Sequence, residues 1–180
     1  RHVGPYAPGD IELAAAFDID QRKVGKPATE AIFAPPNNTR TICEQFEQRG
    51  PIVQMGPILD GYSAHMSQYP AERTFLVAKE KPVNIVSALK DSGADILLNC
   101  LPAGSQNAAE IYANAALEAG VGFINCIPVF IVSDPKWAAR FKQAGLPCIG
   151  DDVKSQIGAT IIHRALTRLF EDRGVRLDAT

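Results

Sequence analysis

The sequence has little net charge and no long apolar run, and both absences exclude classes of function. Its 180 residues carry 18 Lys and Arg against 20 Asp and Glu, a net charge of -2. A protein that binds nucleic-acid backbones needs a basic face, so a generic nucleic-acid binder is excluded. No apolar stretch approaches the ~20 residues of a membrane-spanning helix, so we predict no membrane span. The hydrophobic share of 46% is typical of a globular domain.

Metal-binding and targeting signals are also missing. The four cysteines are widely spaced and form no CxxC pair, which disfavours a zinc site or a disulfide framework. The N-terminus shows neither a signal peptide nor an initiator Met, and the chain stops just after a strong helical pattern. From these features we expect a cytoplasmic protein and a fragment of a longer polypeptide.

Short apolar runs alternate with helical patterns along much of the chain. Strands are predicted at residues 11–17, 51–55, 95–101, 121–127 and 146–149, and a long loop at 56–75. Helices are predicted at residues 29–33, 82–90, 106–119, 135–144 and 155–173, with Ser105, Asp134 and Ser155 as N-caps. This alternation predicts βαβ units, and the continuous apolar runs indicate a parallel sheet buried on both faces. We therefore predict an α/β fold with helices on both faces of the sheet.

Polar residues follow the predicted strands where open parallel sheets bind ligands. Asp18 and Asp20 end the first strand, and an acid there accepts hydrogen bonds from the adenosine ribose of a dinucleotide. A carboxylate would repel the phosphate of NADP, so this interpretation favours NAD. The alternative, that both acids cap a helix beginning near Gln21, is equally open. Residues 1–10 contain no G-x-G-x-x-G motif, so a phosphate loop would lie upstream of Arg1.

Two further strand ends carry candidate ligand-binding groups. The turn Leu101–Ser105 leads into a helix whose N-terminus favours an anion or a cofactor amide, and Gly104 allows close approach to the backbone. Asp151 and Asp152 stand side by side, so a metal, a lysine or a ligand amide would neutralise them. Lys154 would supply a cation to a phosphate or an oxyanion. Ordinary helix capping with a solvated lysine explains the same residues equally well.

Two blocks have a distinctive sequence: Phe-Ile-Asn-Cys-Ile-Pro-Val-Phe-Ile at 123–131, with Ser-Asp-Pro at 133–135, and Gly-Asp-Asp-Val-Lys-Ser-Gln-Ile-Gly-Ala-Thr at 150–160. Together they closely resemble the bacterial, actinobacterial-like myo-inositol-1-phosphate synthase family. Other blocks resemble the same family in the same order, so that the resemblance spans nearly the whole chain: 16–20, 31–33, 37–39, 56–61, 101–105, 163–164 and 169–175.

The resemblance implies a Rossmann-like fold and an NAD-requiring isomerase of inositol and phospholipid biosynthesis. It would convert D-glucose 6-phosphate to 1D-myo-inositol 3-phosphate by oxidation, enolisation, aldol cyclisation and reduction, with no net redox change. The resemblance also implies a cytoplasmic homotetramer and a divalent or monovalent cation beside NAD. Its cofactor-binding residues would be Asp18, Leu101, Gly104, Ser105 and Asp152, and its catalytic residues Lys154 and Asp152.

The chain departs from the family pattern at both ends. The first strand and the Gly-rich loop are missing, as is the downstream block that carries further catalytic residues and the oligomer-forming sheet. We expect residues 1–150 to form a partial NAD-binding domain, and residues 151–180 to connect to the catalytic and oligomerisation domain. Two alternatives stay open: another NAD-linked dehydrogenase on the same fold, and an inactive nucleotide-binding fragment.

Overall fold

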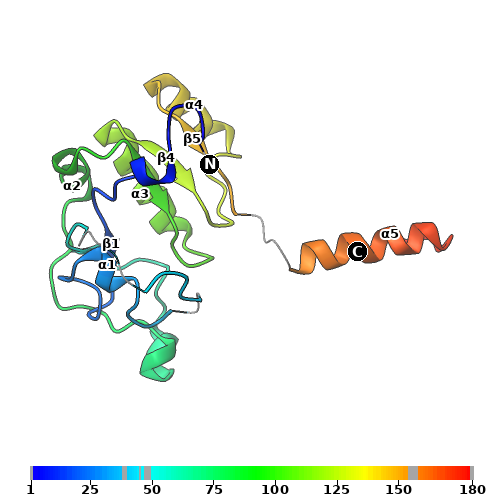
Figure 1. The fold of residues 1–180 in the computed structure, drawn as a ribbon, viewed down its shortest axis with the longest axis horizontal. Helices are drawn as coiled ribbons and strands as arrows, with labels where there is room; N and C mark the ends of the chain where they lie inside the picture. Colours follow the sequence, from blue (N-terminus) through cyan, green and yellow to red (C-terminus); the bar gives the residue numbers. More distant parts are fainter. Residues whose placement is uncertain (1, 38–39, 45, 47–49, 154–157, 179–180) are drawn as a thin grey trace.

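The computed structural model describes residues 2–37, 40–44, 46, 50–153 and 158–178. In chain order these residues form η1 (Pro8–Asp10), β1 (Phe17–Asp18), α1 (Ala28–Ala31), β2 (Gln54–Met55), η2 (Ala64–Gln68), η3 (Ala71–Arg73), α2 (Ile85–Ser92), β3 (Ile96–Asn99), α3 (Gln106–Ala119), β4 (Gly122–Asn125), α4 (Pro135–Ala144), β5 (Cys148–Ile149) and α5 (Ala159–Asp172), where η marks a 3-10 helix. Figure 1 shows their arrangement.

Two parallel sheets carry the fold, which confirms the predicted α/β class. One sheet pairs β1 with β2, and the other has the order β3-β4-β5. In the larger sheet Asn99 lies opposite Asn125 at the carboxyl ends of β3 and β4. The carboxyl ends of these parallel strands therefore share one edge, as the strand-end argument requires.

Local capping signals explain where several helices begin and end. Asn84 caps α2, because its Oδ1 accepts a hydrogen bond from the Ser87 N–H at 3.0 Å. Asp134 caps α4 in the same way, with the Lys136 N–H at 2.8 Å and a proline in the first turn. Gly145 ends α4 in the left-handed conformation that favours glycine.

Some predicted bounds are wrong where tertiary pairing decides the outcome. Of the strand predicted at 11–17 only Phe17 lies in β1, whose two residues, Phe17 and Asp18, pair with Gln54 and Met55 of β2. Helix α2 begins at Ile85 rather than at Pro82. Ser155, predicted to cap the last helix, lies outside the described residues, and Gly158 occupies the N-cap position of α5.

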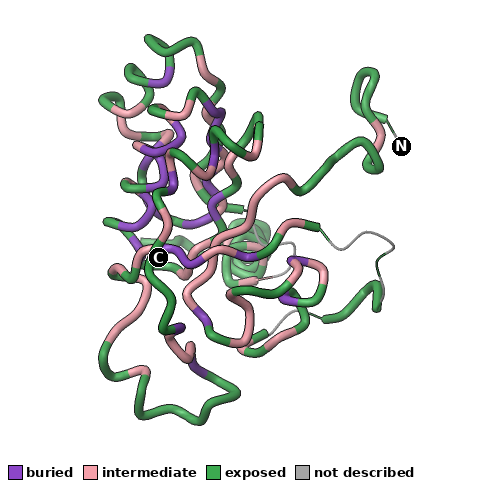
Figure 2. Tube along the Cα trace, turned by 90° about the vertical axis from the view of Figure 1, so that its left-hand side faces the viewer, coloured by how far each residue is buried: buried purple, intermediate pink, exposed green. Residues whose placement is uncertain are grey.

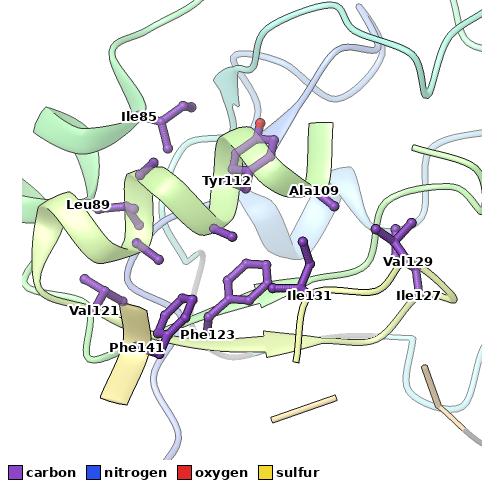
Figure 3. Packing of buried hydrophobic residues seen from close by; sticks show 13 residues of the cluster. Ile85, Leu89, Ala109, Tyr112, Val121, Phe123, Ile127, Val129, Ile131 and Phe141 are labelled. Carbon is purple, nitrogen blue, oxygen red and sulfur yellow. The ribbon is translucent and has the colours of Figure 1, made fainter. Parts of the chain in front are cut away.

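The hydrophobic core lies between α3 and the β3-β4-β5 sheet (Figure 3). Helix α3 faces the sheet with fully buried alanines, Ala109, Ala113 and Ala116. Their small side chains let the helix approach the sheet closely. Beside them Phe123 of β4 and Phe141 of α4 stack with ring centroids 6.1 Å apart. Helix α2 packs on α3 from the outside.

Only one face of the larger sheet is buried, so the prediction of helices on both faces is wrong for the described residues. Side chains alternate between the faces of a strand. Leu97, Phe123 and Cys148 point to the core, whereas Ile96, Leu98 and Ile149 on the other face are 52%, 57% and 62% exposed. Figure 2 shows buried residues concentrated in this larger α/β unit.

Helix α5 stands apart from the α/β unit in Figure 1. None of its residues is buried, although Ile162, Leu166 and Leu169 form an apolar stripe along it. No helix in the described part of the chain has the length and apolar character that crossing a membrane requires.

Candidate functional site at the strand ends

A cavity of about 910 Å³ opens between the carboxyl ends of β1 and β3. Phe17, Asp18 and Ile19 line it on the β1 side, and the segment from Leu97 to Pro102 lines it on the β3 side. The wall is largely apolar with few charged groups, as is typical of a small-molecule site. The charged side chains at the cavity come from Asp18, Lys23, Glu72 and Arg73.

Asp18 is held rigidly at the carboxyl end of β1. Its Oδ1 accepts hydrogen bonds from the backbone N–H groups of Ile19 at 2.7 Å and Asp20 at 2.9 Å. Its Oδ2 lies 3.4 Å from the Nζ of Lys23. The carboxylate is partly exposed toward the cavity, so Oδ2 can still accept a hydrogen bond from a ligand.

Asp20, the neighbouring acid, has a structural role. Its buried carboxylate accepts hydrogen bonds from the Arg22 guanidinium at 2.6 Å and 2.8 Å and from the Leu76 N–H at 2.9 Å. Burial raises the pKa of Asp20, but these hydrogen bonds outweigh burial and hold the pKa below its usual value. No helix begins at Gln21, where the chain forms a turn, so the capping alternative for the two acids is wrong.

In the predicted ligand-binding turn Leu101–Ser105, Leu101 differs from Gly104 and Ser105 in its position relative to the cavity. Leu101 lines the cavity. Gly104 has φ +90°, a conformation that favours glycine irrespective of any ligand. Ser105 is fully buried, and its hydroxyl donates to the Pro102 carbonyl at 2.6 Å instead of capping α3. Whether Gly104 and Ser105 contact a cofactor stays a prediction.

The Asp60 carboxylate lies at the N-terminus of α3, where the sequence predicted that an anion or a cofactor amide would bind. Its carboxylate accepts hydrogen bonds from the N–H groups of Asn107 at 2.7 Å and Ala108 at 3.0 Å. This contact fastens the cavity-lining segment around Leu59 and Gly61 to α3. An internal carboxylate therefore already satisfies this helix end.

The strand ends of β3, β4 and β5 are joined by a polar network that sequence analysis did not find. Asn99 donates its amide to the Oδ1 of Asn125 at 2.8 Å, and Asn125 donates to Asp151 at 2.8 Å. Asp151 also accepts hydrogen bonds at 3.0 to 3.1 Å from the backbone N–H groups of residues 131, 132 and 133. These bonds outweigh burial and lower the pKa of Asp151.

Asp152 points away from this network. It is exposed, adopts φ 71°, and its Oδ1 accepts a hydrogen bond from the Val153 N–H at 2.8 Å. The preceding Gly150 fits closely against β4, because a Cβ there would lie 2.7 Å from the Asn125 carbonyl oxygen. The adjacent acids thus differ: Asp151 is held by hydrogen bonds from Asn125 and the backbone, whereas the Asp152 side chain is exposed to solvent. Lys154 lies outside the described residues.

Tyr112 of α3 is a further cavity-lining residue that sequence analysis missed, because its helical spacing resembled that of core residues. Burial, together with the nearby charge of Asp18, raises the pKa of Tyr112, so its hydroxyl stays protonated at neutral pH. It can therefore donate a hydrogen bond beside the Asp18 carboxylate.

No three His, Cys, Asp or Glu side chains gather as metal ligands among the residues that the structure describes. The cation that the resemblance implies beside Asp152 stays a prediction.

The parallel sheets with a strand-end cavity define an α/β protein of the open-sheet, ligand-binding type. No protein-family model matches the chain. The chain is 50% identical over 177 residues to proteins named inositol-3-phosphate synthase from Mycobacterium tuberculosis (strain CDC 1551), Mycolicibacterium smegmatis and Corynebacterium glutamicum. Each match covers 98% of this chain and 47% of the relative, so the chain spans about half the length of these curated relatives.

One solved structure is also similar to this chain. The chain is similar to the crystal structure of Ari2 with a TM-score of 0.76 and 35% identity, covering 99% of this chain and 50% of the Ari2 chain. This similarity confirms the α/β fold, and the curated relatives confirm the resemblance to the inositol-3-phosphate synthase family.

Proposed function

We propose that this chain forms the cofactor-binding part of an enzyme that converts D-glucose 6-phosphate to 1D-myo-inositol 3-phosphate. The observation that carries the proposal is 50% identity over 98% of the chain to proteins named inositol-3-phosphate synthase. The reaction would proceed by oxidation, enolisation, aldol cyclisation and reduction, as in the family. A cytoplasmic homotetramer is part of the same proposal.

The cavity residues fit the adenosine ribose of NAD. Asp18 stands at the carboxyl end of a parallel strand, where an acid accepts hydrogen bonds from ribose hydroxyls, and its Oδ2 is oriented by the bonds at Oδ1. Phe17, Leu101 and Tyr112 provide apolar and aromatic walls in the same cavity. NAD, when bound, would supply the acceptor and donor of hydride.

Asp152 and Lys154 are the proposed catalytic residues at the end of β5. Asp151 and Gly150 support this assignment for Asp152, since they fix the corner from which its carboxylate projects. A lysine two residues further on would stabilise the negative charge that develops on a sugar oxygen during enolisation. A cation shared with Asp152 would act in the same sense.

The test uses the protein encoded by the longest open reading frame that contains this sequence, hereafter the full-length protein. It is incubated with glucose 6-phosphate and NAD, while inositol phosphate and NADH are followed together. Inositol phosphate without net NADH supports the proposal. NADH accumulation without inositol phosphate would instead identify another NAD-linked dehydrogenase. Neither product, together with measured binding of NAD, would indicate a nucleotide-binding protein without this activity.

Matched variants sharpen the test. Asp152→Asn and Lys154→Ala should abolish product formation, because both remove charge proposed to act on reacting atoms. Asp91→Asn changes an exposed carboxylate on α2, away from the strand ends, and should leave the rate unchanged. Equal rates in Asp152→Asn, Lys154→Ala and Asp91→Asn would contradict the assigned site.

A further inference from the structure

The turn after β1 carries two cations with different surroundings. Arg22 is fully engaged in the fold: its guanidinium binds Asp20 and donates to the carbonyls of Ala71 at 2.6 Å and Thr74 at 2.7 Å. Lys23, the next residue, lines the cavity and faces Asp18. Of these two cations, Lys23 is therefore the one placed to meet a ligand.

Lys23 and Asp18 form a partly buried ion pair. The Lys23 Nζ lies 3.4 Å from the Asp18 Oδ2, and the two side chains are 18% and 25% exposed. Because Oδ1 already accepts two backbone N–H groups, Oδ2 is the oxygen that a ribose hydroxyl would share with Lys23. The ribose end of the cavity is therefore a paired site rather than an isolated carboxylate.

This pairing bears on the choice between NAD and NADP. A lone carboxylate repels a ribose 2′-phosphate, whereas a cation beside it attracts the phosphate. We propose that Lys23 is a specificity-determining residue, so that the Asp18–Lys23 pair, and not Asp18 alone, sets the preference between the two dinucleotides. This inference rests on the proposed binding of NAD in the cavity.

Two other charges at the cavity define the electrostatic background. Glu72 and Arg73 are adjacent in sequence and line the same cavity. Their charges are opposite, and the short charge–charge contact that the structure gives the Asp18 carboxylate is with Lys23, at 3.4 Å, so Lys23 is the cation that acts most strongly on this carboxylate. Removing Lys23 and removing Asp18 should therefore shift the preference between NAD and NADP in opposite directions.

The experiment measures dissociation constants of NAD and NADP by calorimetric titration of the full-length protein at fixed ionic strength. Lys23→Met should raise the ratio of the NADP constant to the NAD constant about fivefold, in line with a partly screened ion pair. Asp18→Asn should lower that ratio by at least as much, because Lys23 then faces the phosphate without its partner. Lys26→Met is the control, since Lys26 is exposed in the same turn region and does not line the cavity.

The double variant Asp18→Asn/Lys23→Met isolates the role of Lys23. It should bind NADP about fivefold more weakly than Asp18→Asn, and this comparison holds even when wild-type affinity for NADP is too low to measure. Unchanged ratios in both Lys23 comparisons, or an equal change in Lys26→Met, would overturn the inference. If the wild-type protein binds NAD while Lys23 has no effect, this inference alone fails. If it binds neither dinucleotide, the cofactor proposal fails as well.

Discussion

The two sheets of this molecule are held in place by different forces. The β3-β4-β5 sheet rests on a core of aromatic and aliphatic residues against α3. The β1-β2 sheet adds only Phe17 to that core, has its own small apolar cluster of Ala28, Ala31 and Val53, and depends more on polar contacts, above all the Asp20–Arg22 pair. The proposed ribose site lies at the junction, on the side held by charges and hydrogen bonds.

This difference shows that positioning an element and orienting a side chain at a strand end depend on different interactions. Burial of apolar area fixes the positions of whole elements, but it does not orient a carboxylate. Directional hydrogen bonds do so, at Asp18 through two backbone N–H groups and at Asp151 through three. Substitutions of apolar residues and of hydrogen-bonding residues therefore test the two kinds of support separately.

The largest effect is expected in the apolar region. Phe123→Ala should lower the free energy of unfolding by about 3–5 kcal/mol, because it leaves a cavity beneath α3. Phe130→Ala is the control, since Phe130 is exposed, and should change it by less than about 0.5 kcal/mol. Denaturant unfolding of the full-length protein measures both, and equal losses would contradict the placement of the core.

The adjacent acids at the end of β5 should differ next. Asp151→Ala leaves backbone N–H groups of residues 131–133 without their acceptor and should cost about 2–3 kcal/mol. Asp152→Asn removes an exposed negative charge, and asparagine tolerates the left-handed backbone at φ 71°, so it should cost less than about 0.5 kcal/mol while abolishing activity. A reversed order of stability losses would show that the network is assigned to the wrong acid.

The polar region should also show a characteristic pH dependence. The pKa of Asp20 is lower in the folded state, so its stabilising contribution is present above the unfolded pKa of about 3.9. That contribution is lost as the pH falls through the folded pKa. Asp20→Asn should cost about 1–2 kcal/mol at neutral pH and flatten the acid limb of the stability curve. Unfolding free energies between pH 2 and 6 test this, and an unchanged acid limb would argue against it.

The smallest effect is expected on the open face of the larger sheet. Leu98→Thr should change the stability of the 180-residue chain by about 0.5 kcal/mol or less, because Leu98 is exposed. It should reduce concentration-dependent association, since β3 has a neighbour on one side only among the described strands. Light scattering measures the association. A stability loss as large as that of Phe123→Ala would mean that this face is covered.

Sequence patterns predicted the features that depend on local chemistry. The caps at Asp134 and Gly145, the alternation of strands and helices, and the position of Asp18 at a strand end all follow from neighbouring residues. The second face of the larger sheet was predicted to be buried but is exposed, because apolar runs do not reveal whether a covering layer is present.

The contacts that orient the site come from residues distant in sequence, which local patterns cannot pair. Asp60 reaches the N-terminus of α3, and Asn125 reaches Asp151. For Gly104 and Ser105 the sequence could not separate a structural from a functional role. The backbone conformation of Gly104 and the buried hydrogen bond of Ser105 are structural reasons for these residue types. Their roles toward a cofactor, and those of Asp152 and Lys154, stay predictions.

We propose above all that Asp18 binds the ribose of NAD at the carboxyl end of β1. Its most direct test is the dissociation constant of NAD for the full-length protein and for Asp18→Ala, with Asp91→Ala as the control. We predict binding by the wild type and a loss of about tenfold to a hundredfold in Asp18→Ala, the scale of hydrogen bonds to a charged group. Equal affinities in wild type and Asp18→Ala would contradict the account.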